Sequence, residues 1–132
     1  MYMVKLKVKK SKIHGKGTFA LENIPKGTIV WLYEPSHDLS ITQDEFEKLD
    51  DDEKRRFRHS AYLSPWTGLW ICPPPGDEEY TNHSLKNNTT VYYDKKVSPE
   101  PYFVANRDIA RGEEITNNYY EFDAITRKSN CI

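Results

Sequence analysis

The sequence predicts a mostly β domain of short strands with one small helical insert. Turn signals made of glycine, proline or asparagine recur about every eight to twelve residues, and β-branched and aromatic residues gather between them. The clearest helix-capping pattern lies in the middle of the chain. With 132 residues the chain has room for one compact domain, which would bury about two thirds of the surface that its unfolded form exposes. We therefore expect a single domain over residues 1–132, with an insert at about 38–63 and a tail at 124–132.

Three strands are expected in the first third of the chain. Residues 3–9 alternate apolar side chains with lysines, a period of two that is typical of a strand with one wet face. A glycine-containing turn then leads into a short strand at 18–21, and a second turn at 24–27 leads into a buried strand at 28–33. The lysines are expected to be solvated, and a nucleic-acid patch is the less favoured interpretation.

Two helices are predicted in the insert. Thr42 and Glu45 have the spacing of a capping box, and Phe46 lies where it would share one helical face with Leu49. Asp50 can cap a second helix that reaches about His59. The charged faces of such helices are usually only solvated.

The second half returns to strands. Prolines after Pro65 exclude a helix there, and strands are expected at 91–93 and 101–105. The turn at 109–112 repeats the chemistry of the turn at 24–27, with isoleucine at its start and glycine at its end.

Charge, apolar content and cysteine content limit the classes of binding partner and the cellular compartments that are expected. Nineteen basic and twenty acidic side chains leave a formal charge of −1, so no global field favours nucleic acid or a membrane, and no direct partner of either kind is expected. The sequence opens without an apolar signal region and lacks an apolar run of about eighteen residues, which favours an intracellular protein, cytoplasmic or nuclear, including a host nucleus. Cys72 and Cys131 are expected to be free thiols, and no metal site is expected.

Three segments in order carry a resemblance to a known family. They are His14-Gly15-Lys16-Gly17, Thr81-Asn82-His83-Ser84, and the run from Gly112 to Tyr119. Together they resemble the signatures of the SET domain, the fold of many S-adenosylmethionine-dependent protein lysine methyltransferases, over about residues 9–123. Each segment alone is a weak signal, because glycine and asparagine mark many turns. The resemblance implies a β-clip fold with a C-terminal pseudoknot, in which the segment after Tyr119 threads beneath an earlier loop.

The same resemblance implies a binding site for S-adenosylmethionine. The main chain of Gly15, Lys16 and Gly17 would hold the methionine end of the cofactor, because glycine lets a backbone approach a ligand closely. Asn82 would hold the amino and carboxylate groups, and the main chain of His83 would meet the adenine. Without the resemblance, these residues would be interpreted as a hairpin turn and a structural hydrogen-bonding pair.

The resemblance also assigns catalytic and substrate-binding residues. Tyr119 takes the position of the family's catalytic tyrosine and would also contact the cofactor, where it would orient a neutral amine toward the methyl group. Lysine has a pKa of about 10.4 in water, so an aromatic channel that disfavours the ammonium would assist its deprotonation. Trp70 and Tyr80 are the candidates for this channel, and Phe122 is the candidate for packing on the adenine. An alternative for each aromatic residue is a place in the core.

The sequence departs from the family pattern at several positions. Leu85 replaces the cysteine that often follows the Asn-His-Ser motif, and the tail lacks the cysteines of a zinc-binding module. Asn117 and Asn118 replace the usual aromatic and acidic residues before the tyrosine. The chain therefore resembles a minimal SET domain, similar in size to virus-encoded and bacterial members. Residues 122–132 or a second copy, in a homodimer, would then close the channel.

The predicted function is transfer of a methyl group from S-adenosylmethionine to a lysine of a protein substrate, such as a histone tail or another basic protein. One alternative is a non-catalytic SET-like module that binds the cofactor or a peptide. Another is a small β-clip interaction domain that is unrelated to methylation.

Overall fold

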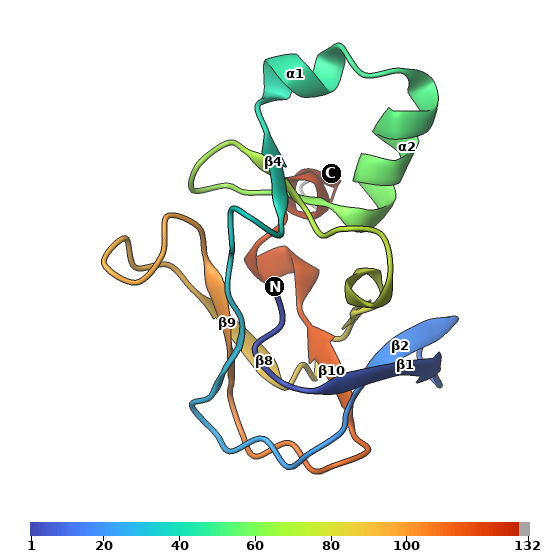
Figure 1. Cartoon of the computed structure of the whole chain (residues 1–132), viewed down its shortest axis with the longest axis vertical. Coiled ribbons are helices and arrows are strands. Elements are labelled where there is room, and N and C mark those ends of the chain that lie inside the picture. Colours follow the sequence, from blue (N-terminus) through green and yellow to red (C-terminus); the bar gives the residue numbers. More distant parts are fainter. Residues whose placement is uncertain (130–132) are drawn as a thin grey trace.

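The fold consists of three small sheets joined by turns and short helices (Figure 1). A computed structural model describes residues 1–129. The first sheet has the order β1-β2-β10-β7. Its strands are β1 (Leu6–Lys10), β2 (Lys16–Ala20), β10 (Glu114–Asn117) and β7 (Asn82–His83). Strand β10 pairs antiparallel with β2 and parallel with β7, so a late strand lies between two earlier ones.

The other two sheets have three strands each and are antiparallel. One has the order β3-β9-β8, with β3 at Ile29–Trp31, β9 at Tyr102–Ala105 and β8 at Thr89–Tyr92. The other has the order β4-β6-β5, with β4 at Leu39–Ile41, β6 at Trp70–Cys72 and β5 at Tyr62–Leu63. The predicted mostly β class is thereby confirmed.

The helical insert lies between β4 and β5 and forms a lobe at one end of the molecule (Figure 1). It contains α1 (Gln43–Glu47) and α2 (Asp51–Ser60). The predicted capping box is present, since the backbone N–H of Glu45 donates to Thr42 and the backbone N–H of Thr42 donates back to the Glu45 carboxylate. Asp50 caps α2 as expected.

Three further short helices complete the described chain. They are the 3₁₀ turns η1 (Asp77–Glu79) and η2 (Tyr119–Glu121) and the helix α3 (Ala124–Ser129). Helix α3 packs against β5 and η2. Within residues 1–129, no helix has the length and apolar character needed to cross a membrane.

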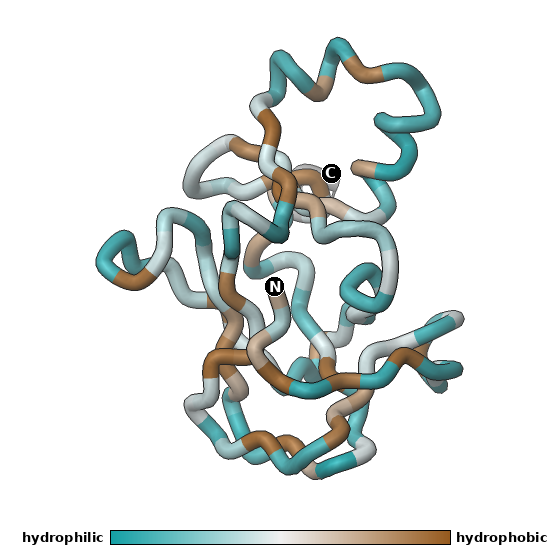
Figure 2. Tube along the Cα trace, viewed as in Figure 1, coloured by the Kyte–Doolittle hydropathy of each residue, from teal (hydrophilic) through white to brown (hydrophobic). Residues whose placement is uncertain are grey.

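The buried apolar side chains of the described residues form three groups. The first lies between the sheet that contains β2 and β10 and the sheet that contains β3 and β9. It contains Ala20, Ile24, Val30, Ala105, Ile109 and Ile115. The second is central and contains Trp31, Ile71, Phe103 and Phe122. The third holds the insert and contains Phe46, Phe57, Trp70 and Cys72. The insert helices are mostly hydrophilic in Figure 2. Each of them buries only one residue, so most of their side chains face solvent.

The N-terminal segment differs from the prediction. Strand β1 begins at Leu6 rather than Met3, because the chain before it turns toward the second sheet. Tyr2 forms a bridge with Trp31, and the N–H of Met3 donates to the carbonyl of Val30. These hydrogen bonds bring the Tyr2 side chain into the centre of the molecule.

The two similar turns seen in the sequence lie opposite each other. The backbone N–H of Ile24 donates to the carbonyl of Ile109, and the reverse bond is also made, both at 2.8 Å. Gly27 and Gly112 end these turns with φ of 90° and 88°, a region that side chains disfavour. These hydrogen bonds connect the turn between β2 and β3 to the turn between β9 and β10.

Candidate functional site

The three motif segments meet on one sheet. The Gly15–Gly17 turn leads into β2, Asn82 and His83 form β7, and Tyr119 follows β10, which lies between those strands. Parallel pairing aligns Thr116 with Asn82 and Asn117 with His83. Because β10 holds both neighbours in register, residues from the start, middle and end of the chain share one corner.

Asn82 connects β7 to the glycine turn. Its side-chain Nδ2 lies 3.1 Å from the carbonyl of His14, 3.1 Å from that of Lys16 and 2.8 Å from the Glu114 carboxylate. The asparagine amide therefore fixes the main chain on either side of Gly15.

Glu114 links the same corner to the β1–β2 hairpin. One carboxylate oxygen accepts the Asn82 bond, and the other accepts a bond of 2.6 Å from the Ser11 hydroxyl. A Cβ atom on Gly17 would clash with the Glu114 carboxylate, so that side chain would have to move if Gly17 were replaced by a larger residue. The constraint on Gly17 comes from this neighbouring side chain rather than from its own backbone angle.

His83 positions the start of η2. Its ring nitrogen Nδ1 accepts the backbone N–H of Tyr119 at 3.0 Å, and its ring lies 5.1 Å from the Tyr119 ring. The Tyr119 hydroxyl donates to the carbonyl of Thr81, the residue before Asn82. Both ends of Tyr119 are thus held by the segment that carries the Asn-His motif.

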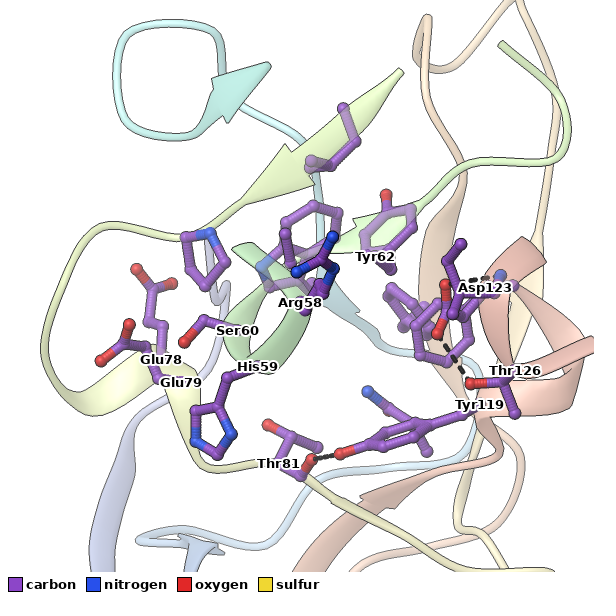
Figure 3. Close-up of a pocket in the computed structure, with 18 of the residues that line it drawn as sticks. Arg58, His59, Ser60, Tyr62, Glu78, Glu79, Thr81, Tyr119, Asp123 and Thr126 are labelled. Atoms are coloured by element: carbon purple, nitrogen blue, oxygen red, sulfur yellow. Dashed lines mark hydrogen bonds between the residues drawn. The ribbon is translucent and has the colours of Figure 1, made fainter. Parts of the chain in front are cut away.

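A cavity of about 260 Å³ lies beside Tyr119 (Figure 3). Its inner wall is aromatic and includes Tyr2, Trp31, Tyr62, Phe103, Tyr119 and Phe122. Its mouth carries polar side chains from the insert, η1 and the segment after η2, which are Arg58, His59, Glu78, Glu79 and Asp123. In Figure 3, the Tyr119 hydroxyl points to Thr81 on one side, while Asp123 and Thr126 lie on the other. The cavity is thus polar at its mouth and aromatic inside.

Burial keeps the tyrosines of this cavity neutral. Desolvation, with a smaller contribution from the Asp123 charge, raises the pKa of Tyr119 to about 12. Burial also raises the pKa of Tyr2, whose hydroxyl contacts the Thr81 hydroxyl. At neutral pH both phenols keep their protons.

The predicted site residues are only partly brought together. Phe122 lines the cavity and packs edge-on against Tyr119 at 5.8 Å, in the central core group. Trp70 lies elsewhere, because its ring stacks on Phe46 at 4.4 Å and its Nε1 donates to Gln43. Trp70 borders a second hollow of about 680 Å³ between the insert, β5 and α3.

Tyr80 does not line either cavity. Its ring lies 5.5 Å from the Lys16 ammonium, beside the glycine turn. Gly15, Lys16, Gly17, Asn82, His83 and Tyr119 all lie at the common corner described above.

Sequence reasoning missed Tyr2, Tyr62 and Thr81. Tyr2 and Tyr62 are far from every motif along the chain, and strand pairing and the end of the insert bring them to the cavity. Thr81 belongs to a motif segment, but its carbonyl and hydroxyl become relevant only through the two tyrosines that contact them.

The residues present fit S-adenosylmethionine. A Cβ atom on Gly15 would meet no protein atom within 4 Å, so the main chain held by Asn82 faces open space. Tyr119 lines the aromatic cavity, and the hydrogen bond to His83 joins Tyr119 to the same corner. A polar end and an apolar end suit a ligand that carries an amino acid group and a reactive centre.

Two solved structures illustrate the similarity of the fold. A Plasmodium falciparum protein assigned as a histone methyltransferase is 25% identical, with a TM-score of 0.58, over 89% of this chain and 94% of that chain. A humanized mutant of the Chaetomium thermophilum Polycomb Repressive Complex 2, bound to the inhibitor GSK126, gives 27% identity and a TM-score of 0.65. That match covers 94% of this chain and 16% of the other.

The model of the SET domain family matches residues 15–120, and the chain belongs to this family. The family resemblance seen in the sequence is therefore confirmed. No curated protein sequence gives a significant match.

Proposed function

We propose that this protein transfers a methyl group from S-adenosylmethionine to a lysine side chain of a protein substrate. The observation that carries the proposal is the convergence of the glycine turn, Asn82 and His83 at one corner, which His83 joins to Tyr119 in the wall of an aromatic cavity. The family of the chain and its similarity to histone methyltransferases support this chemistry.

The glycine turn, Asn82 and His83 would hold the cofactor. The turn offers backbone groups beside open space, and Asn82 keeps that backbone in place. When bound, S-adenosylmethionine supplies an electrophilic methyl group on a sulfonium. Phe122 and the neighbouring rings would exclude water from this end of the cavity.

The cavity would admit the lysine chain and favour its neutral form. The carboxylates of Glu78, Glu79 and Asp123 at the mouth attract a cation, whereas the aromatic interior gives an ammonium no comparable solvation. The amine therefore loses its proton to solvent before it attacks. This step sets the protonation state that nucleophilic attack requires.

Tyr119 would orient the amine without acting as a base. Its hydroxyl proton is directed to the Thr81 carbonyl, so the phenol oxygen remains available to accept a hydrogen bond from the amine. Because burial raises the pKa of Tyr119 to about 12, the phenol stays protonated while it does so. Alignment of the amine with the methyl group is the main catalytic contribution of the chain.

The test is incorporation of labelled methyl groups into a panel of basic proteins, histones included. The wild-type chain should label at least one of them, and Tyr119→Phe should do so about a hundredfold more slowly. Cofactor binding without any product would support the non-catalytic module instead. Absence of cofactor binding would support the β-clip interaction domain.

A further inference from the structure

Three side chains with metal-binding atoms meet outside the corner described above. His37 and Asp38 lie just before β4, and Glu78 lies in η1. One nitrogen or oxygen atom of each residue lies within 4.8 Å of the corresponding atoms of the other two. Nε2 of His37 contacts the Glu78 carboxylate directly.

Asp38 is the buried member of the cluster, and its Oδ2 already forms an ion pair with the Met1 ammonium. The residue is 3% exposed, and its Oδ2 accepts bonds of 2.8 Å from the backbone N–H of Glu34 and from the Met1 amino group. Its Oδ1 is buried and has no hydrogen-bond partner among the described residues. A buried carboxylate oxygen without a partner is costly, and a metal ion bound at this cluster would satisfy it.

The ligand types indicate the class of ion. One imidazole and two carboxylates form a mixed nitrogen and oxygen set, which suits Zn²⁺ and related first-row ions better than Mg²⁺ or Ca²⁺. Three protein ligands leave a fourth position for water. The His37 side chain is 35% exposed, so an ion can reach the cluster from solvent on this side.

We propose that His37, Asp38 and Glu78 form a binding site for a divalent transition-metal ion, with Zn²⁺ as the preferred occupant. The ion joins the segment before β4 to η1. Glu78 also accepts the backbone N–H of Tyr2 at 2.6 Å, and both Glu78 and Tyr2 line the Tyr119 cavity. Metal binding therefore fixes one wall of that cavity. The site does not depend on whether the protein transfers methyl groups.

Calorimetric titration of the full chain with ZnCl₂, after treatment with EDTA, tests the proposal. The titration should show that one ion binds per chain. In a separate thermal unfolding experiment, a Zn²⁺ concentration one hundred times the dissociation constant should raise the Tm by about 5 °C or more. His37→Ala and Glu78→Gln should each weaken binding more than about tenfold, and Glu78→Gln keeps an oxygen for the Tyr2 bond.

His14→Ala provides the control, because His14 is exposed and lies outside the three-residue cluster. This variant should bind Zn²⁺ with wild-type affinity. Comparing the zinc-induced change in Tm, rather than Tm itself, separates metal binding from any effect of a variant on folding. Failure of the wild-type chain to bind Zn²⁺, or equal binding by His37→Ala, would overturn the proposal.

Discussion

At the scale of single residues, the phenol of Tyr119 combines two properties that are usually separate. It donates to a backbone carbonyl, and burial raises its pKa to about 12, so it remains neutral throughout the range in which a lysine loses its proton. The proposed role as an orienting group follows from these two facts. It makes the substrate, rather than the enzyme, responsible for the pH dependence of the reaction.

We therefore expect kcat/KM to rise with pH up to about 9, following the neutral fraction of the substrate lysine. Tyr119→Phe should lower the rate by about a hundredfold at each pH and leave the slope unchanged. Rate measurements at several pH values check this. A slope that flattens in the variant would instead indicate that the Tyr119 phenolate acts as a base.

Asn82 gives a second prediction at this scale, because its amide nitrogen faces three oxygen acceptors. Asn82→Asp would place a carboxylate against Glu114 and two carbonyls, which should destabilise the fold by about 2 kcal/mol. Glu114→Gln in the same chain restores a donor between the two side chains and should recover part of that loss. Urea unfolding of the two single variants and the double variant measures the coupling. Additive effects would contradict the proposed contact.

The same residues show what a sequence can and cannot predict about a site. The motif residues Gly17, Asn82 and Tyr119 were recognisable because their order along the chain resembles a family. Trp70 was placed in the channel from its position before the Asn-His motif, but its actual environment is set by Phe46, which arrives from the insert. Tyr2 reaches the cavity because it forms a β-bridge with Trp31, and the sequence around Tyr2 contains no local pattern that indicates this pairing.

At the scale of elements, β2, β10 and β7 form the frame of the site, and Gly17 marks their closest approach. Gly17→Ala should push the Glu114 carboxylate away from Asn82 and Ser11. Cofactor affinity, measured by calorimetry, should then fall by about tenfold or more, because the turn loses the contact that fixes it.

Gly27→Ala is the matched control for this prediction. Gly27 has φ of 90°, so alanine there should cost about 1 kcal/mol or more of stability through backbone strain. Gly27 lies in a turn outside both cavities, and its variant should keep wild-type cofactor affinity. Equal losses of affinity in both variants would mean that general destabilisation, rather than the Glu114 contact, explains the effect.

Elements were more predictable than contacts. The capping box at Thr42 and the Asp50 cap give both insert helices, because these signals are local. The period-two pattern of residues 3–9 predicted a strand that begins too early, since hydrogen bonds to β3 compete for Met1 to Met3. Pairing between distant strands decides such boundaries, and one sequence does not contain that information in local form.

At the scale of the whole molecule, a buried carboxylate affects the pH dependence of stability. Glu100 is 2% exposed, and one of its oxygens has no partner among the described residues. Desolvation raises the pKa of Glu100, opposed by the hydroxyls of Thr67 and Ser64. A raised pKa in the folded state means that this group favours folding most below its ordinary pKa of 4.5, and that the contribution is lost as the pH rises.

Glu100→Gln should therefore raise the Tm at pH 8 and reduce the loss of stability between pH 5 and pH 8. The glutamine keeps the shape of the side chain and removes the buried charge. Thermal unfolding of both proteins across this pH range is the measurement. An unchanged pH dependence in the variant would show that Glu100 does not titrate in the folded protein over this interval.

Strand β10 also determines when the corner between β2 and β7 can assemble. Strand β10 pairs with β2 on one side and with β7 on the other. The side chains of Asn88 and Thr89, at the start of β8, also form hydrogen bonds with the β10 backbone. A nascent chain that has not yet delivered residues 114–117 lacks the partner that aligns β2 with β7. Residues 114–117 must be synthesised, and long-range strand pairing must form, before β2 and β7 can take the alignment seen at this corner.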